Sequence, residues 1–312
     1  MKITELFEVS ISPHIRDEDS VSKIMWSVAI ALIPAFIASL VFFGNDALRL
    51  VFVSVCACLI TEYVIRKVRK RDCTISDGSA VITGMLLAFC VPPTVPSWMI
   101  AVGAFLAIAL GKEIFGGLGM NVFNPALAAR AILLAAFPSE MTRWTSPDAV
   151  TTATPLGMVK EGLTDSLPQY YDLFIGNVGG CIGETSAIAL ILGGLFLVFR
   201  KVIKIELPLI YVGGVFGLSA LVGRDPVYEI LAGGLMLGAF FMITDMVTTP
   251  VTRVGGYIFA GGCAVITVAI RSWGGYPEGV CYSILIMNAI TPLIDKYTAP
   301  RRLGQILQKK NV

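Results

Sequence analysis

The stretch Ile24-Met-Trp-Ser-Val-Ala-Ile-Ala-Leu-Ile-Pro-Ala-Phe-Ile-Ala-Ser-Leu-Val-Phe-Phe43 contains no charged residue from end to end. A helix that crosses a bilayer needs about 20 mostly apolar residues, and this stretch has that length. The whole chain follows the same pattern, because 55% of its 312 residues are hydrophobic and only 15% are charged. Soluble domains carry roughly 25% charged residues. The sequence therefore predicts an all-α polytopic membrane protein.

Ten apolar stretches are candidate transmembrane spans, and most of them approach the length of a bilayer crossing. They are residues 24–43, 48–65, 78–93, 97–112, 121–137, 185–200, 205–222, 227–244, 255–272 and 279–295. The third and fifth are short or broken by Pro, Gly and Asn, so we expect them to be re-entrant or discontinuous.

The spans fall into two groups, 24–137 and 185–295, separated by a hydrophilic loop at 138–184. A polar segment, 1–23, precedes them and a tail, 296–312, follows. The first segment lacks the short apolar core and small-residue cleavage site of a signal peptide, so we expect the first span to be an uncleaved anchor.

Most of the 24 Lys and Arg residues fall on one side of this ten-span arrangement, including a basic cluster at 66–71. Cytoplasmic loops carry an excess of Lys and Arg. Both termini are therefore predicted to be cytoplasmic, and loop 138–184 to lie on the external face.

The two groups of spans resemble each other in sequence. Leu86-Leu-Ala-Phe89 is echoed by Leu237-Gly-Ala-Phe240, and Phe115-Gly-Gly117 is echoed by Trp273-Gly-Gly275. Five spans per half is an odd number, so the two halves would have opposite orientations. Such inverted five-helix repeats place a binding site at their interface in many membrane proteins.

Gly116 and Gly117 precede the fifth span, in which Asn124-Pro-Ala repeats weakly as Asn288-Ala289. Glycine lets the backbone approach a flat ligand closely, and a helix that begins after such a turn directs free N–H groups towards it. The alternative is tight helix packing through small residues.

Arg130 lies nine residues into the fifth span, near the middle of the membrane at about 1.5 Å rise per residue. A charge at that depth must be paired or must face a polar cavity. We expect Arg130 to hold an anionic or electron-rich group. The alternative is a structural pair with a carbonyl, with Asp148 or with Glu140.

Asp245 ends the eighth span, close to Thr244, Thr248 and Thr249. These oxygens could coordinate a cation, or the carboxylate could end the helix in water. The seven cysteines form no Cys-x-x-Cys pair and His14 is the only histidine, so we expect no metal site made by this chain alone. A cysteine pair that contributes to a cluster shared between subunits remains an alternative.

The polar loop contains the run Asp148-Ala-Val-Thr-Thr-Ala-Thr-Pro-Leu-Gly157. A residue that precedes proline favours an extended backbone, so we expect Thr154 to present an accessible hydroxyl. From the residues alone, a threonine-rich loop without further function is the alternative.

Four segments together resemble the flavin-carrying membrane subunits of the Rnf electron-transport complex and of the sodium-translocating NADH:quinone reductase. They are Asp77 to Pro96, Gly111 to Arg130, Phe240 to Asp245, and Ser272 to Asp295. The resemblance covers most of the chain from about residue 20 to residue 300. In length the chain is more similar to the Rnf D subunits than to the longer B subunits of the quinone reductase.

The resemblance implies FMN bound to a threonine through a phosphoester, in a motif like Asp-Gly-x-Ser-Gly-Ala-Thr-Pro-Leu. The corresponding position is Thr154; Ala149 and Thr152 replace glycines of the motif, and Thr151 replaces its serine. It also implies a second, non-covalent flavin (riboflavin) in the membrane domain. The further candidate cofactor-binding residues are Asn124, Arg130, Gly116, Gly117 and Asp245.

The implied function is electron transfer within a ferredoxin:NAD⁺ oxidoreductase of the bacterial inner membrane, coupled to Na⁺ or H⁺ transport. The implied partners are other membrane and peripheral subunits and the lipid bilayer, with no nucleic acid. No catalytic acid–base residue is expected in this chain. A channel or secondary transporter without a redox cofactor is the alternative function, and a passive membrane scaffold is a third.

Overall fold

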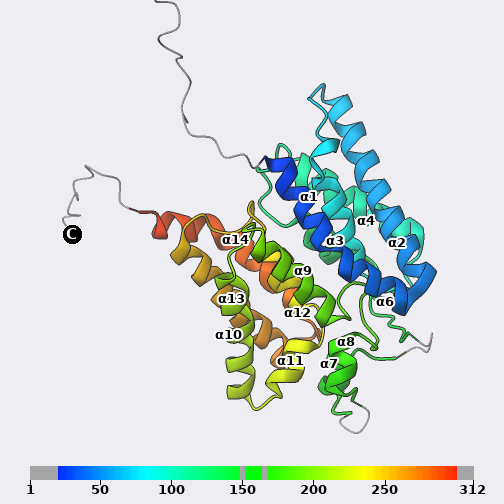
Figure 1. The fold of residues 1–312 in the computed structure, drawn as a ribbon, viewed down its shortest axis with the longest axis vertical. Helices are drawn as coiled ribbons and strands as arrows, with labels where there is room; N and C mark the ends of the chain where they lie inside the picture. The colour runs from blue at the N-terminus through cyan, green and yellow to red at the C-terminus, as the bar shows by residue number, and fades with distance from the viewer. Residues whose placement is uncertain (1–19, 148–151, 164–166, 301–312) are drawn as a thin grey trace, which may run out of the picture.

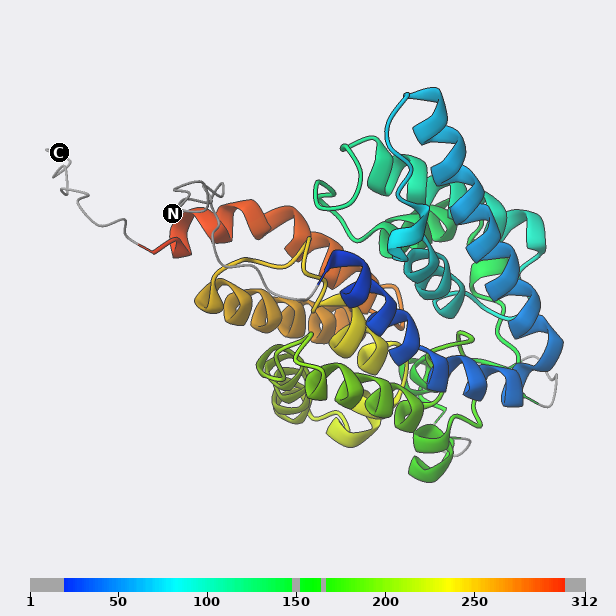
Figure 2. The same ribbon diagram turned by 45° about the horizontal axis from the view of Figure 1, so that its top comes forward.

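The computed structural model describes residues 20–147, 152–163 and 167–300. Helices dominate this part of the chain, and it contains no extended β-strand, which confirms the all-α class. Figures 1 and 2 show two helical groups side by side, the first running from blue to green-cyan and the second from green to red.

The first half contains helices within all five of the expected stretches, although their bounds differ from those predicted. They are α1 (Val21–Ala31), α2 (Ile33–Val68), α3 (Ser79–Phe89), α4 (Ser97–Ile108) and α5 (Pro125–Ala136). Gly44 has non-helical dihedrals (φ 55°, ψ −131°), and the chain bends sharply there, so the first two candidate spans are the two arms of this bend (Figure 1). The third and fifth spans are short as predicted, because α3 has 11 residues and α5 has 12.

The second half contains four of the predicted spans as helices: α9 (Ala187–Phe199), α10 (Glu206–Val222), α13 (Arg253–Trp273) and α14 (Val280–Thr298). The prediction of one continuous span at 227–244 is wrong. That stretch is divided into α11 (Pro226–Leu231), α12 (Leu235–Leu237) and a π-helical turn, Gly238–Met242. Gly233 takes a left-handed φ of +69° between the first two pieces, a conformation that glycine adopts readily and that ends the helix.

Corresponding helices of the two halves pack in the same way. In each half the second helix contacts the fourth, α2 with α4 and α10 with α13. The halves meet through α1 against α9 and through α5 against α14. By length and composition, Val21–Val68 and Arg253–Trp273 can cross a membrane, and four shorter helices are also apolar. Large apolar side chains are exposed on the outer faces, as on a lipid-covered surface.

Each half also buries a group of paired charges at the ends of corresponding helices. In the first half, Lys112 lies 2.8 Å from Glu62, and Arg66 lies 2.9 Å from Glu113. In the second half, Glu229 pairs with Arg271 at 2.8 Å and with Arg224 at 2.6 Å. Buried charges in a membrane protein are costly unless they are paired, so these pairs let each half keep its charges inside.

The loop between the halves is folded and packs against the second half. Its described part forms α6 (Pro138–Met141), α7 (Pro155–Glu161) and α8 (Tyr170–Ile175). Figure 1 shows α7 and α8 at the end of the molecule opposite to the C-terminal end of α2. A small apolar core joins the loop to α11 and contains Leu156, Leu173, Val178, Tyr228 and Ala232. This packing positions the segment that contains Thr154.

Gly84 allows α2 and α3 to approach closely, and its replacement gives a first testable prediction. A Cβ atom at Gly84 would lie 2.7 Å from the Cα of Val55, so Gly84→Ala must push the two backbones apart. Overpacking of this kind costs about 1–3 kcal/mol. We expect a lower thermal unfolding midpoint in detergent.

Gly217→Ala in α10 is the matched control, because no atom lies within 4 Å of its Cβ position. Alanine has the higher helix propensity, so this control should unfold at the wild-type temperature or slightly above it. Equal midpoints for the two variants would contradict the close approach of α2 to α3.

Candidate functional site

Thr154 adopts the extended backbone predicted for a residue before proline, with φ −66° and ψ 154°. Its Oγ1 accepts a hydrogen bond from the Gly157 N–H at 3.1 Å and so caps α7. The expectation of an exposed hydroxyl is wrong, because the residue is only 4% exposed. The surrounding loops enclose it, and Thr154 lines two cavities instead of facing open water.

The larger of these cavities, named here the attachment cavity, contains about 940 Å³ of space, part of it open to solvent. Thr154, Arg130, Trp144, Tyr276 and Tyr282 are among its lining residues. The rings of Tyr276 and Tyr282 are stacked, with centroids 5.4 Å apart. The cavity therefore combines a hydroxyl, flat aromatic walls and a cationic side chain.

Two hydrogen bonds hold α7 close to this cavity. Lys160 in α7 donates to the backbone oxygens of Gly274 and, at 3.0 Å, of Tyr276. These contacts attach the Thr154 segment to the connection between α13 and α14, although the two are more than 100 residues apart in the chain.

Arg130 is buried, and it is paired as its position in the fifth span requires. Its guanidinium lies 3.4 Å from Oε1 of Glu184 and 2.6 Å from Oε2 of Glu278. Glu140 is not among these partners, so the predicted alternative of a pair with Glu140 is wrong. The other alternative partner, Asp148, lies outside the described residues. Sequence reasoning missed both carboxylates, although Glu278 belongs to the segment Ser272–Gly279 and Glu184 ends the polar loop.

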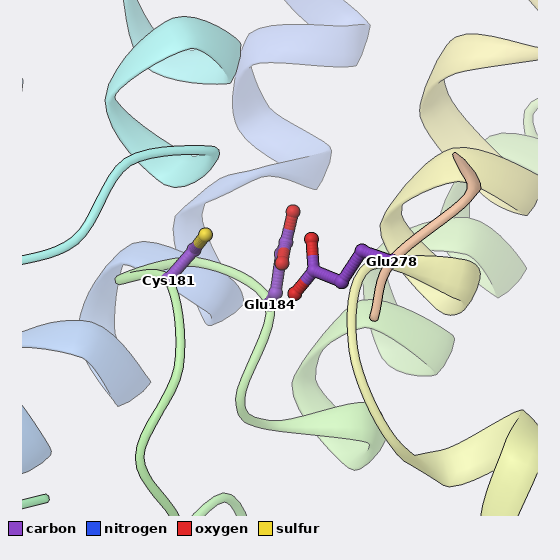
Figure 3. Close-up of side chains that lie close together, drawn as sticks. All are labelled: Cys181, Glu184 and Glu278. Atoms are coloured by element: carbon purple, nitrogen blue, oxygen red, sulfur yellow. The ribbon is translucent and has the colours of Figure 1, made fainter. Parts of the chain in front are cut away.

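Cys181 joins these three residues, and the four are named here the carboxyl cluster. Figure 3 shows the carboxylates of Glu184 and Glu278 close together, with Cys181 on the same loop as Glu184 and Glu278 on a separate segment. The possible ligand atoms of Cys181, Glu184 and Glu278 lie within 4.8 Å of one another. Arg130 already contacts all three groups, since it also donates to Cys181 Sγ at 3.6 Å.

Cys181 is a buried thiol beside the carboxylate of Glu184. Burial, followed by the negative charge of Glu184, raises the pKa of the Cys181 thiol well above its ordinary value. The cluster thus consists of two carboxylates held by an arginine, with the Cys181 thiol beside them.

A third cavity, the inter-half cavity, lies between the two groups of helices and contains about 790 Å³, part of it open to solvent. Asn124 and Asp245 both line it, together with Lys112. Asn124 Oδ1 caps α5 by accepting the Ala126 N–H at 3.1 Å. Asp245 accepts the N–H of Val247 at 3.2 Å, so each side chain is held by local hydrogen bonds at the cavity wall.

Asp245 Oδ2 also accepts the hydroxyl of Thr248 at 3.1 Å. Its other neighbours do not join this contact, since Thr244 donates to Phe240 O and Thr249 to Ile243 O. The four residues thus bond mainly to the local backbone, and the cation site inferred from the sequence remains a prediction.

Gly116 and Gly117 lie elsewhere. Both have left-handed φ values, 127° and 108°, which explains why glycine occupies these positions. The backbone oxygen of Gly116 accepts a hydrogen bond from Arg71 at 3.0 Å. A Cβ at Gly117 would lie 2.4 Å from the Arg66 guanidinium. Neither glycine lines any of the three cavities, and both lie beside the basic side chains of Arg66 and Arg71.

Known proteins are similar in sequence to this chain over nearly its whole length. Residues 8–304 match the NQR2, RnfD, RnfE family. The D subunit of a proton-translocating ferredoxin:NAD(+) oxidoreductase complex from Clostridium ljungdahlii is 48% identical, with 96% of each chain covered. The D subunit of a Na(+)-translocating ferredoxin:NAD(+) oxidoreductase complex from Acetobacterium woodii is 50% identical, covering 97% of this chain and 96% of its own.

A more distant relative, the D subunit of an ion-translocating oxidoreductase complex from Halorhodospira halophila, is 36% identical over 96% of each chain. Family match and relatives extend across both helical halves and the loop between them, so the agreement is not confined to one motif. The chain belongs to the NQR2, RnfD, RnfE family.

Proposed function

We propose that this chain is the D subunit of an ion-translocating ferredoxin:NAD⁺ oxidoreductase complex and carries a flavin bound covalently to Thr154. The names of its relatives support the complex, and they include both a proton-translocating and a Na⁺-translocating member. The observation that carries the flavin assignment is the position of Thr154 on the wall of a roomy, aromatic cavity.

The residues present fit a flavin at this position. The attachment cavity contains about 940 Å³ and offers the flat side chains of Trp144, Tyr276 and Tyr282 to a planar ring system. Gly157 keeps the space beside the hydroxyl open, because a Cβ there would lie 3.1 Å from Thr154 Oγ1. Arg130 also lies at the cavity wall, where its guanidinium is paired with Glu184 and Glu278. When bound, the flavin supplies the electron-transfer chemistry, and the chain supplies position, burial and charge.

We propose the inter-half cavity as the seat of the second, non-covalent flavin. Its volume suits a ring of the same size, and polar side chains from both halves, including Asn124 and Asp245, face it. Gly116 and Gly117 have no part in this proposal, since they pack on Arg66 and Arg71.

The architecture that we propose is a bilayer-spanning pair of inverted five-helix repeats with cytoplasmic termini and an external Thr154 loop. The corresponding packing of α2 with α4 and of α10 with α13 supports the repeat. The buried charges at the ends of corresponding helices support it as well. The excess of Lys and Arg on one side supports the orientation.

Flavin fluorescence of the denatured wild-type chain on a gel tests the proposal. We expect a fluorescent band when the chain is produced together with an active flavin transferase, and a dark band without the transferase. A known substrate of the transferase, produced alongside, shows that the enzyme works. A dark band under both conditions would overturn the flavin assignment and favour a transporter, which should instead show solute flux after reconstitution.

A further inference from the structure

The carboxyl cluster has an uneven charge balance. Two ionised carboxylates, Glu184 and Glu278, face the single positive charge of Arg130. The neighbouring Arg271 and Arg224 both pair with Glu229, at 2.8 and 2.6 Å, and neither forms an ion pair with the two carboxylates of the cluster. The carboxylate oxygens of Glu184 and Glu278 lie within 4.8 Å of each other, and two buried carboxylates that share a site resist ionising together. One bound proton would relieve the repulsion between them.

Glu184 has the environment of a group that holds this proton. It is 4% exposed, and its buried Oε2 has no hydrogen-bond partner among the described residues. Burial, and then the charge of Glu278, raises the pKa of Glu184 to about 7, although Arg130 and Arg271 oppose this shift. Because burial raises the pKa of the Cys181 thiol, Cys181 adds no negative charge to the cluster at neutral pH.

The cluster also lies in the wall of the site that contains Thr154. Glu278 lines the attachment cavity and also the smaller cavity of about 320 Å³ beside it, and Thr154 lines both. Glu184 and Cys181 line only the smaller cavity, while Arg130 lines the attachment cavity. Arg130 and Glu278 therefore connect the attachment cavity to the cluster, and a charge that appears in this cavity would act on the carboxylates through a buried wall.

We propose that Glu184 and Glu278 together hold one exchangeable proton, which the pair takes up when an electron adds negative charge to the group in the attachment cavity. This inference rests on the proposed function. The electron comes from a one-electron donor elsewhere in the complex, and the proton comes from a hydronium ion of the solvent, which becomes water. An O–H bond forms on one carboxylate oxygen, so one electron and one proton enter together and the local charge does not change. Oxidation of the group releases the proton again.

Infrared spectroscopy tests the proton site without any flavin. The full wild-type chain, produced without flavin transferase, is titrated from pH 5 to pH 9. A carboxylic-acid C=O band should disappear as the pH rises through about 7. In Glu184→Gln this band should be absent. In Glu278→Gln the band should disappear at a lower pH than in the wild type. The remaining carboxylate of Glu184 then faces Arg130 without a competing negative charge.

Glu140→Gln is the matched control, since Glu140 lies on the same loop, in α6, outside the cluster. It should keep the band. Both cluster variants replace a carboxylate by a neutral amide of the same shape and relieve excess negative charge, so both should fold. A wild-type chain without a band that titrates near neutrality, or a band that persists unchanged in both cluster variants, would overturn the proton site.

The redox part is measured on the flavin-loaded chain as a reduced-minus-oxidised infrared difference spectrum. We expect the same C=O band to grow on reduction in the wild type and in Glu140→Gln, and not in the two cluster variants. A band that titrates with pH but does not change on reduction would overturn the proposed coupling of proton uptake to electron transfer. If the chain carries no flavin at all, the proposed function fails, and the titration alone still decides whether the pair holds a proton.

Discussion

Thr154→Ala is expected to remove all covalently bound flavin, because the alanine has no oxygen that could form the phosphoester. The fold should survive. The lost hydrogen bond from Gly157 to Oγ1 caps only the short helix α7, and loss of an N-cap costs about 1 kcal/mol. In-gel fluorescence of equal amounts of variant and wild-type chain measures the attachment, and size-exclusion chromatography in detergent checks the fold.

Two threonine variants serve as controls for this result. Thr154→Ser keeps a hydroxyl at the same position and should keep the fluorescence. Thr152→Ala removes a neighbouring hydroxyl that bonds to the backbone oxygen of Ala153, and it should also remain fluorescent. If Thr154→Ala stays fluorescent, the attachment must move to another residue, with Thr151 and Thr152 the next candidates.

Arg130→Met should be the most destabilising single change in the carboxyl cluster. Methionine fills a similar volume but leaves Glu184 and Glu278 buried without the guanidinium that contacts both. Removal of one partner from a buried ion pair costs about 3–5 kcal/mol. We expect a strongly reduced yield of folded chain and a much lower thermal unfolding midpoint in detergent.

Neutralising both carboxylates should restore the stability that Arg130→Met removes. The triple variant Arg130→Met, Glu184→Gln, Glu278→Gln contains no unpaired charge in the cluster, so its stability should return towards the wild-type value. Arg143→Met, at an exposed position in the loop between the halves, should have no effect. A variant Arg130→Met as stable as the wild type would show that the ion pairs do not hold these segments together.

Much of the fold follows from local sequence, because apolar length and helix-breaking residues act locally. The short third and fifth helices were predictable from Pro, Gly and Asn in those stretches, and Asn124-Pro125 marks the start of α5. The break at Gly233 was missed because the stretch 227–244 is largely apolar. Nothing local distinguishes a glycine that packs inside a membrane helix from one that ends it.

The site was predictable only where its geometry is local. The backbone of Thr154 follows from Pro155, and that part of the prediction holds. Its burial depends on segments that come later in the chain, such as the one that Lys160 binds. Arg130 was identified by the cost of its burial, but its partners are 54 and 148 residues away, a separation that a single sequence does not reveal.

We expect the distribution of the buried ion pairs to set an order of assembly during synthesis. Glu62, Arg66, Lys112 and Glu113 neutralise one another within the first half, so that half can enter lipid before the second has left the ribosome. In the second half, Arg224 and Arg271 both pair with Glu229, so these contacts also form within one half. Arg130 has to wait for Glu278, made 148 residues later, so the wall behind Thr154 closes only when the two halves dock. A flavin transferase that needs an open loop would have to act on Thr154 before the two halves dock. One that needs the completed cavity wall could act only after they dock.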